Sequence, residues 1–166
     1  MKKIAVLIEN LFDEQELIYP YHRLREDFEV HLIGTEKDKA YESKSGMKLK
    51  STHSSDEVNP TDYDGVIIPG GFSPDYMRKS QATIDFVKAV GEAGKPVAAI
   101  CHGPWMLASA LDLKGKDITS TPNIKIDLIH AGAKWQDSEV VVSDNIVTSR
   151  TPLDLPAFMK AFLELV

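Results

Sequence analysis

The only cysteine of the chain stands where a thiol could act as a nucleophile. Cys101 falls between an apolar strand predicted at 96–100 and a helix predicted to begin at Pro104, and Gly103 leaves room around the turn. A strand that passes this abruptly into a helix is typical of a nucleophile elbow. Because a helix N-terminus stabilises an anion, we predict a lowered pKa for the thiol. The alternative, a small buried core residue, fits this turn less well.

The end of another apolar strand offers backbone hydrogen-bond donors. The run 63–68 is predicted to be a buried strand, and Pro69, Gly70 and Gly71 follow it. Two glycines after a strand free backbone N–H groups and let a substrate approach closely. We predict that this strand lies beside the strand of Cys101 and that Gly70 and Gly71 form an oxyanion hole. A tight turn without a chemical role is the alternative.

Carboxylates follow the first apolar strand, and one of them could serve the thiol. They are Glu9, Asp13, Glu14 and Glu16. Acids in the first turn of a helix commonly complement the helix dipole, and we interpret at least two of the four in this way. A carboxylate directed over the sheet edge could reach Cys101. Burial would raise its pKa, so that it could hold or move a proton near neutral pH.

His102 is the evident base for the thiol, although neighbouring side chains on a regular element point apart. Contact between Cys101 and His102 therefore requires the turn to fold the imidazole back. The remaining histidines show no metal-ligand spacing, and we interpret them as surface or satisfied core residues. They are His22, His31, His53 and His130. No metal or nucleotide cofactor is expected.

Strand and helix patterns alternate along the chain and must position these residues. Apolar strands are predicted at 4–8, 30–33, 63–68 and 96–100, a hairpin at 139–148, and short antiparallel strands within 35–60. Helices are predicted at 13–28, 82–93, 104–111 and 123–131, with a last one from 151. Pro20 should kink the first helix or end its first turn. On the last helix Phe158, Phe162 and Leu165 are expected to share one face.

This alternation predicts a single-domain α/β fold over residues 1–166, with a mostly parallel sheet and helices on both faces. Ligands of such folds bind beyond the carboxyl ends of the strands, where the candidate residues lie. The composition, 43% hydrophobic and 27% charged, is that of a soluble globular domain. A net charge of −6 without a basic cluster argues against nucleic-acid binding. No apolar stretch approaches the ~18 residues of a membrane span, and one cysteine suits a reducing compartment, so we expect a cytoplasmic protein.

Four segments together form a specific pattern. They are ELIYPYHRL (16–24), PGG (69–71), KPVAAICHGP (95–104) and Ala131-Gly132 with Trp135. In these segments, and over nearly its whole length, the chain resembles the ThiJ/PfpI family of the class I glutamine amidotransferase-like superfamily. The resemblance implies a flavodoxin-like three-layer sandwich that assembles as a homo-oligomer, either a dimer or a ring of dimers. It also implies activities described as intracellular peptidase, glutathione-independent glyoxalase, deglycase and stress chaperone.

The resemblance also implies roles for individual residues. Cys101 matches the nucleophile, His102 the histidine beside it, and Glu16 the acid hydrogen-bonded to that cysteine, while Gly70 and Gly71 match the oxyanion-hole segment. In the PfpI branch a third acid comes from a neighbouring subunit, and here Asp75 stands at its position. Thr121 replaces a tyrosine near the site, and Asp13 replaces a glutamate, so both are candidate substrate-binding residues.

Other proteins with related folds lack support in this sequence. A glutamine amidotransferase needs a distant His-x-Glu, but the only histidine after residue 102 is His130, which Ala131 and Gly132 follow. A flavodoxin needs a phosphate-binding loop after the first strand, where this chain has 9–13. A receiver domain needs an aspartate where this chain has Pro69.

Three functions remain open. The leading hypothesis is a cofactor-free cysteine enzyme that acts on reactive dicarbonyls or on their adducts with proteins or peptides. The second is a cysteine peptidase, in which Asp75 of a partner subunit orients His102. The third is a redox-sensing stress chaperone, because an activated thiolate oxidises readily.

Overall fold

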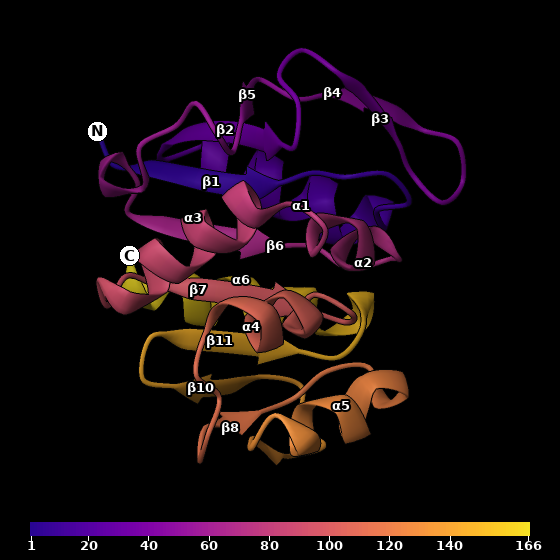
Figure 1. Ribbon diagram of the computed structural model, residues 1–166, viewed down its shortest axis with the longest axis vertical. Helices are drawn as coiled ribbons and strands as arrows, with labels where there is room; N and C mark the ends of the chain where they lie inside the picture. Colours follow the sequence, from indigo (N-terminus) through magenta and orange to yellow (C-terminus); the bar gives the residue numbers. More distant parts are fainter.

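The computed structural model describes residues 1–166, and its centre is a seven-stranded sheet (Figure 1). The strand order is β10-β11-β7-β6-β1-β2-β5, and every pairing is parallel except that of β10 with β11. The bounds are β1 Lys3–Leu7, β2 Glu29–Gly34, β5 His53–Ser54, β6 Gly65–Ile68, β7 Val97–Ile100, β10 Val141–Ser143 and β11 Ile146–Ser149. The predicted α/β fold and the pairing of β6 with β7 are confirmed.

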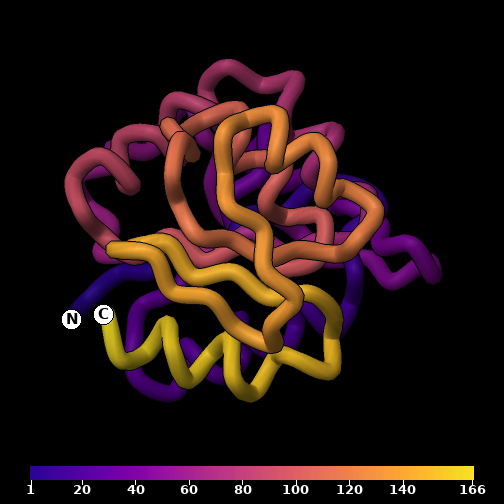
Figure 2. Tube along the Cα trace, turned by 90° about the horizontal axis from the view of Figure 1, so that it is seen from below, coloured from indigo at the N-terminus to yellow at the C-terminus, as the bar shows by residue number.

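Helices cover both faces of this sheet (Figures 1 and 2). They are α1 Glu14–Arg25, α2 Ser73–Met77, α3 Gln81–Glu92, α4 Pro104–Ala110, α5 Lys125–His130 and α6 Leu155–Leu165. One core cluster joins α2, α3, α4 and α5 to one face of the sheet. A second cluster joins α1 and α6 to the other face. The strands alternate side chains between the two clusters, so Ala5 belongs to the first and Val6 to the second. None of the helices is both long and apolar enough to cross a membrane.

Several local predictions need correction. The segment 35–60 does contain an antiparallel pair, β3 Ala40–Glu42 with β4 Lys48–Lys50, but β5 joins the main sheet in parallel beside β2. A second small sheet, β8 Asp117–Ile118 with β9 Lys134–Trp135, was not predicted. These strands have two or three residues each, which is too short for a hydrophobic period to reveal them.

Two helix predictions also differ from the structure. Helix α1 continues through the buried Pro20 to Arg25, so proline does not end its first turn. The predicted helix 123–131 begins with a 3-10 turn, Pro122–Ile124, before α5. The remaining 3-10 turns are Pro60–Asp62 and Pro152–Asp154.

The face of α6 that packs on the sheet is narrower than predicted. Phe158 and Phe162 are fully buried, but Leu165 near the end of the chain is 40% exposed. The ring of Phe162 lies so close to Gly65 of β6 that a methyl group there would approach it to 2.9 Å. Packing of the Phe162 ring against a glycine of β6 therefore fixes α6 on the sheet.

Replacing Phe162 with alanine should lower the free energy of unfolding by about 3–5 kcal/mol, because the cavity cannot close around a missing ring. The matched variant Leu165→Ala on the same helix should cost about 0.5 kcal/mol or less. Urea unfolding followed by circular dichroism measures both. Similar losses in the two variants would show that the packing of α6 has been misassigned.

Candidate active site

Cys101 occupies a strained turn between β7 and α4. Its backbone φ angle is 63°, in the left-handed region that residues other than glycine rarely adopt. The turn can be this tight because Gly103 lacks a side chain: a Cβ there would lie 2.5 Å from the carbonyl oxygen of Ile68. The backbone of Cys101 is held on both sides, since its N–H donates to Ser149 and its carbonyl accepts from Thr121, each at 3.0 Å. The predicted elbow geometry is present.

Glu16 reaches this elbow from the first turn of α1. Asp13 caps the helix, its Oδ1 accepting the N–H groups of Gln15 and Glu16. Glu16 has no exposed surface. Its Oε1 accepts the N–H of Gly70 at 2.9 Å, while its buried Oε2 has no hydrogen-bond partner. Of the four acids considered from the sequence, Glu16 is therefore the one directed into the site.

Gly70 brings the end of β6 against both Glu16 and Cys101. A Cβ on Gly70 would lie 2.5 Å from Glu16 Oε1 and 2.9 Å from Cys101 Cβ, so only glycine permits this approach. Because its N–H is bonded to Glu16, Gly70 does not offer the donor that we expected it to direct at a substrate.

Gly71 keeps its N–H for other partners. Its φ angle is +70°, and a Cβ would lie 2.3 Å from the carbonyl oxygen of Leu11. Gly71 is bridged to Phe12, but the two hydrogen bonds of that bridge run from Phe72 to Leu11 and from Asp13 to Gly70. The N–H of Gly71 lies outside this pairing and remains a candidate oxyanion donor.

His102 does fold back onto the thiol. Its Nδ1 lies 3.6 Å from Cys101 Sγ, a contact that the strained turn makes possible between adjacent residues. The indole ring of Trp105, one turn along α4, packs at a tilt against the imidazole with ring centroids 5.2 Å apart. The backbone N–H of His102 also faces the sulfur and favours its charged form. Sequence reasoning missed this second candidate oxyanion donor, although it follows the nucleophile directly.

The prediction of a lowered thiol pKa is wrong. Burial, together with the neighbouring Glu16 carboxylate, raises the pKa of Cys101 to about 12. Burial and the charge of Asp13 likewise raise the pKa of Glu16 to about 8. At neutral pH both acids therefore hold their protons. This also removes the argument for an oxidation-prone thiolate.

The imidazole is the group in this site that can take the thiol proton. Burial, and then the positive charge of Lys44, lower the pKa of His102, so its ring is neutral at pH 7. A protonated thiol donates to a neutral ring nitrogen, and His102 then carries its own proton on Nε2. Sequence reasoning also missed Lys44, which lies in the turn between β3 and β4, a polar segment without a recognisable motif.

The remaining predicted residues serve in different ways. Asp13 is buried and pairs with Lys44 at 2.6 Å, besides capping α1. Thr121 supports the elbow through its backbone, while its hydroxyl donates to Asn123 at 3.3 Å. Asp75 lies half-buried on α2, and no hydrogen bond or ion pair connects it to His102 within the chain. The structure thus joins Cys101, His102, Glu16 and Gly70 but leaves Asp75 apart.

No group of three or more histidine, cysteine, aspartate or glutamate side chains is arranged to hold a metal ion.

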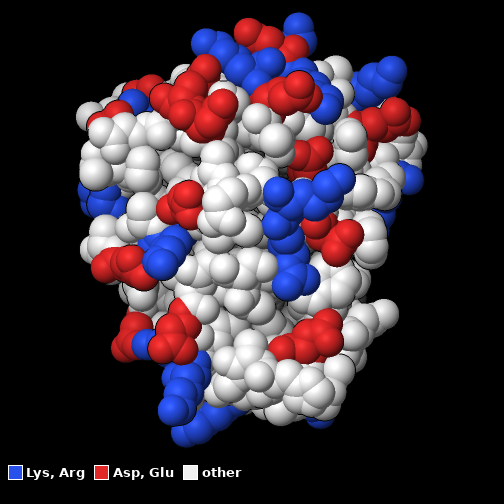
Figure 3. Space-filling view, in the orientation of Figure 1, with Lys and Arg blue, Asp and Glu red and all other residues white.

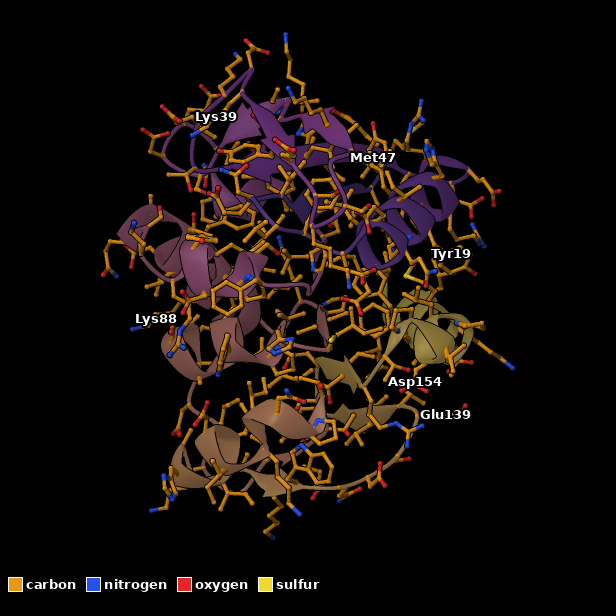
Figure 4. All side chains as sticks on the ribbon, turned by 90° about the vertical axis from the view of Figure 1, so that its right-hand side faces the viewer. Tyr19, Lys39, Met47, Lys88, Glu139 and Asp154 are labelled. Atoms are coloured by element: carbon orange, nitrogen blue, oxygen red, sulfur yellow. The ribbon has the colours of Figure 1, made fainter.

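The most voluminous surface hollow, about 600 Å³, lies on the outer side of α1 and not at the sulfur. Tyr19 of α1 and Met47 of the β3–β4 turn line it, and Figure 4 labels both on one side of the molecule. Acidic and basic side chains are interspersed on the face drawn in Figure 3.

The two-sided sandwich with a cysteine on a strand–helix elbow defines a class of single-domain α/β proteins. Within that class, the chain belongs to the DJ-1/PfpI family, whose family model matches residues 2–165. The resemblance inferred from the sequence motifs is thereby confirmed.

Curated relatives cover the chain almost completely. Deglycase PH1704 of Pyrococcus horikoshii is 43% identical over 99% of both chains. Putative cysteine protease YraA of Bacillus subtilis is 47% identical over 99% of this chain and 98% of its own. A two-domain protein of Anabaena variabilis, with DJ-1/ThiJ/PfpI-like and ferritin-like domains, has a crystal structure that superposes with a TM-score of 0.96 at 39% identity. This match covers 99% of the present chain and 48% of the other. The names of the two curated relatives indicate enzymes within the family.

The raised pKa of Glu16 makes stability depend on pH. The unfolded chain releases this proton near pH 4.5 and the folded chain near pH 8. The stabilisation that protonated Glu16 contributes to the folded state is therefore complete below pH 4.5, and it is lost as the pH rises through 8. Glutamine keeps the acceptor for Gly70 and has no proton to lose. We expect the melting temperature of wild type to fall relative to Glu16→Gln between pH 5 and 9, by about 2–4 °C per kcal/mol of lost stability.

Glu14→Gln is the control, because Glu14 lies on the same turn. Burial, the largest single effect, raises the pKa of Glu14, but hydrogen bonds from the side chains of Ser43 and Ser45 and from backbone N–H groups together lower it to about 2. Its contribution is already complete above pH 4.5, so its melting difference should stay constant from pH 5 to 9. Parallel melting curves for wild type and Glu16→Gln across this range would contradict a protonated Glu16.

Proposed function

We propose that the protein is a cofactor-free cysteine enzyme that acts on small reactive dicarbonyls or on their adducts with proteins and peptides. The observation that carries the proposal is the contact of Cys101 Sγ with His102 Nδ1 at 3.6 Å, next to a fully buried Glu16 carboxyl group that packs against Gly70 beside the cysteine. Such a site can remove one proton and supply another within a single reaction. A relative with 43% identity that is named a deglycase supports this choice.

The first step is addition of the thiol to an aldehyde carbon. His102 Nδ1 takes the proton from Sγ as the sulfur–carbon bond forms, and the carbonyl oxygen gains the negative charge. The N–H groups of Gly71 and His102 would face that oxygen. Protonation of the oxygen by the carboxyl group of Glu16 completes a hemithioacetal and leaves an ionised Glu16 beside the imidazolium of His102.

The second step moves a proton between the two carbons of the former dicarbonyl. Glu16, now ionised, takes the proton from the sulfur-bearing carbon and returns it to the neighbouring carbon, and its pKa of about 8 suits both transfers. The imidazolium of His102 protonates the second oxygen and then takes the proton of the first hydroxyl group. The product of this shift is a thioester of a hydroxy acid. Water then cleaves the thioester: Glu16 takes a proton from the attacking water, and the imidazolium of His102 protonates the departing sulfur. The hydroxy acid is released, and the thiol, the neutral imidazole and the protonated carboxyl group are restored. With an adduct as substrate, the amine departs when the sulfur replaces it.

The proposal includes the setting of the enzyme. Residues 1–166 would form one catalytic domain, and copies of the chain would assemble into a dimer or a ring of dimers. A reducing compartment such as the cytoplasm would keep the single thiol free.

Purified protein incubated with methylglyoxal, without glutathione, should produce lactate, and Cys101→Ser should abolish this activity. Glu16→Gln should reduce turnover about 10²–10⁴-fold, since loss of one general acid–base group typically has that effect. Glu14→Gln should remain active. Lactate formation by Cys101→Ser at the wild-type rate would refute the proposal, while equal activity of the two glutamine variants would refute the role of Glu16.

A second candidate is a cysteine peptidase, supported by the relative whose name is that of a cysteine protease at 47% identity. Cys101 and His102 would be nucleophile and base, and an acid must orient the imidazole. Within one chain no acid bonds to His102, so Asp75 of a neighbouring copy would supply it.

If the peptidase mechanism holds, casein cleavage by the oligomer should fall at least about tenfold in Asp75→Ala, and dissociation of the oligomer should abolish it. Asp85→Ala on α3 is the control for loss of a surface carboxylate, because Asp85 is exposed and its side chain bonds Gln81 of the same helix. Cleavage that survives Asp75→Ala unchanged would exclude this mechanism.

A further inference from the structure

The turn between β3 and β4 places a lysine side chain at the Cys101 site. Lys44 Nζ lies 2.6 Å from Asp13 Oδ2, directly before the helix that carries Glu16. Figure 1 shows the β3–β4 hairpin on the side toward which the strands of the main sheet point. Lys44 therefore belongs to a segment outside the main sheet and lies near the carboxyl ends of the main-sheet strands.

The hairpin is held in place by its backbone and not by this ion pair alone. The N–H of Leu11 donates to Glu42 at 2.7 Å, and the N–H of Lys44 donates to Phe12 at 3.1 Å. The N–H of Ser45 donates to Glu14 at 3.0 Å. These bonds fix the Cα of Lys44 against the segment between β1 and α1. The backbone position of Lys44 is thus a property of the fold, and the ion pair with Asp13 directs its side chain.

Asp13 orients the ammonium group without using all of its capacity. The aspartate is itself fixed, because its other oxygen caps α1. An ammonium group has three N–H donors, and the pair with Asp13 needs one of them. The side chain of Lys44 is 54% exposed, so a ligand arriving from solvent can reach the remaining donors.

The positive charge of Lys44 interacts with the charged forms of the reactive groups of the site. It favours the ionised form of Glu16, against the larger effect of burial, and it disfavours a charged His102. In return, the hydrogen-bonded Asp13 and the charges of Glu16 and Cys101 raise the pKa of Lys44 despite some burial. Lys44 contacts Asp13 directly, and its charge interacts with those of Glu16, Cys101 and His102. Lys44 therefore supplies positive charge beside three acids.

We propose that Lys44 binds anions at the Cys101 site. Through this residue the site selects small aldehydes that carry a carboxylate on the carbon next to the reacting carbon. Where the proposed dicarbonyl reaction operates, the same ammonium stabilises the negative charge that develops on the oxygen beside that carbon. This catalytic clause depends on the proposed function, whereas the binding preference does not. A Coulomb attraction at a partly exposed site is enough to produce selectivity of several-fold.

Alkylation of Cys101 by two reagents of different charge tests the binding preference. Iodoacetate and iodoacetamide attack the same thiolate and lose the same iodide, so the ratio of their rates cancels the fraction of ionised thiol. Lys44→Met keeps most of the side-chain stem and removes the charge. We expect the iodoacetate-to-iodoacetamide ratio to fall by about fivefold or more in this variant.

Lys48→Met is the matched control, because Lys48 is an exposed lysine on strand β4 of the same hairpin. It should leave the rate ratio unchanged, and Lys44→Arg should restore it. An unchanged ratio in Lys44→Met, or an equal fall in Lys48→Met, would overturn the proposal. Should Lys44→Met fail to fold, Lys44→Gln tests the same charge, and a wild-type ratio in that variant would equally overturn it.

Reversible aldehydes test the ligand class. Glyoxylate adds to a thiol through its aldehyde carbon and carries a carboxylate on the next carbon, whereas acetaldehyde lacks the carboxylate. Glyoxylate should protect Cys101 from iodoacetamide at about fivefold lower concentration in wild type than in Lys44→Met, and acetaldehyde equally in both. Equal protection by glyoxylate would overturn the assignment. Because neither measurement requires turnover, they remain informative if no lactate is formed from methylglyoxal.

Discussion

The architecture of the site depends on the close packing of one buried carboxyl group. Glu16 has no exposed surface, and its Oε1 accepts the N–H of Gly70 at 2.9 Å. A side chain on Gly70 would collide with both Glu16 and Cys101. The segments that follow β1, β6 and β7 can therefore approach one another here only because residue 70 is a glycine. The same packing removes water from the carboxyl group, and this loss of solvation is the main reason why its pKa rises to about 8.

The two apolar cores place this polar group with precision. Leu17 and Leu24 of α1 are fully buried in the cluster that includes α6. Glu16 precedes Leu17 on the helix, so packing of the leucine fixes where the carboxyl group points. The elbow is fixed in a similar way, because Ile100 lies in the same cluster and Gly103 lies against the end of β6. Hydrophobic packing thus fixes both Glu16 and Cys101, and the hydrogen bond from Gly70 holds Glu16 at the end of β6, beside the cysteine.

Burial outweighs the helix dipole in setting the state of the thiol. Helix α4 has seven residues, and a helix N-terminus contributes about 0.3–1 kcal/mol to a nearby anion. Removing a charged group from water has an effective penalty of several kcal/mol. Burial raises the pKa of Cys101 to about 12 and that of Glu16 to about 8, so at neutral pH the resting site holds two protons. Chemistry then requires a base within reach, and the neutral His102 at 3.6 Å from the sulfur meets this requirement.

The sequence by itself determined the α/β class, the family, the elbow at Cys101 and the adjacency of β6 and β7, because these depend on local periodicity, glycine placement and motif spacing. The family resemblance already assigned Glu16 to the cysteine, and the tertiary structure supplies the physical reason: Glu16 and Glu14 share a helical turn, and only packing buries one of them. Tertiary structure also gave the N–H of Gly70 to Glu16 and brought Lys44 to Asp13 from a hairpin without a motif. Burial and contacts between distant segments set these pairings and the thiol pKa, and no residue pattern along the chain encodes them.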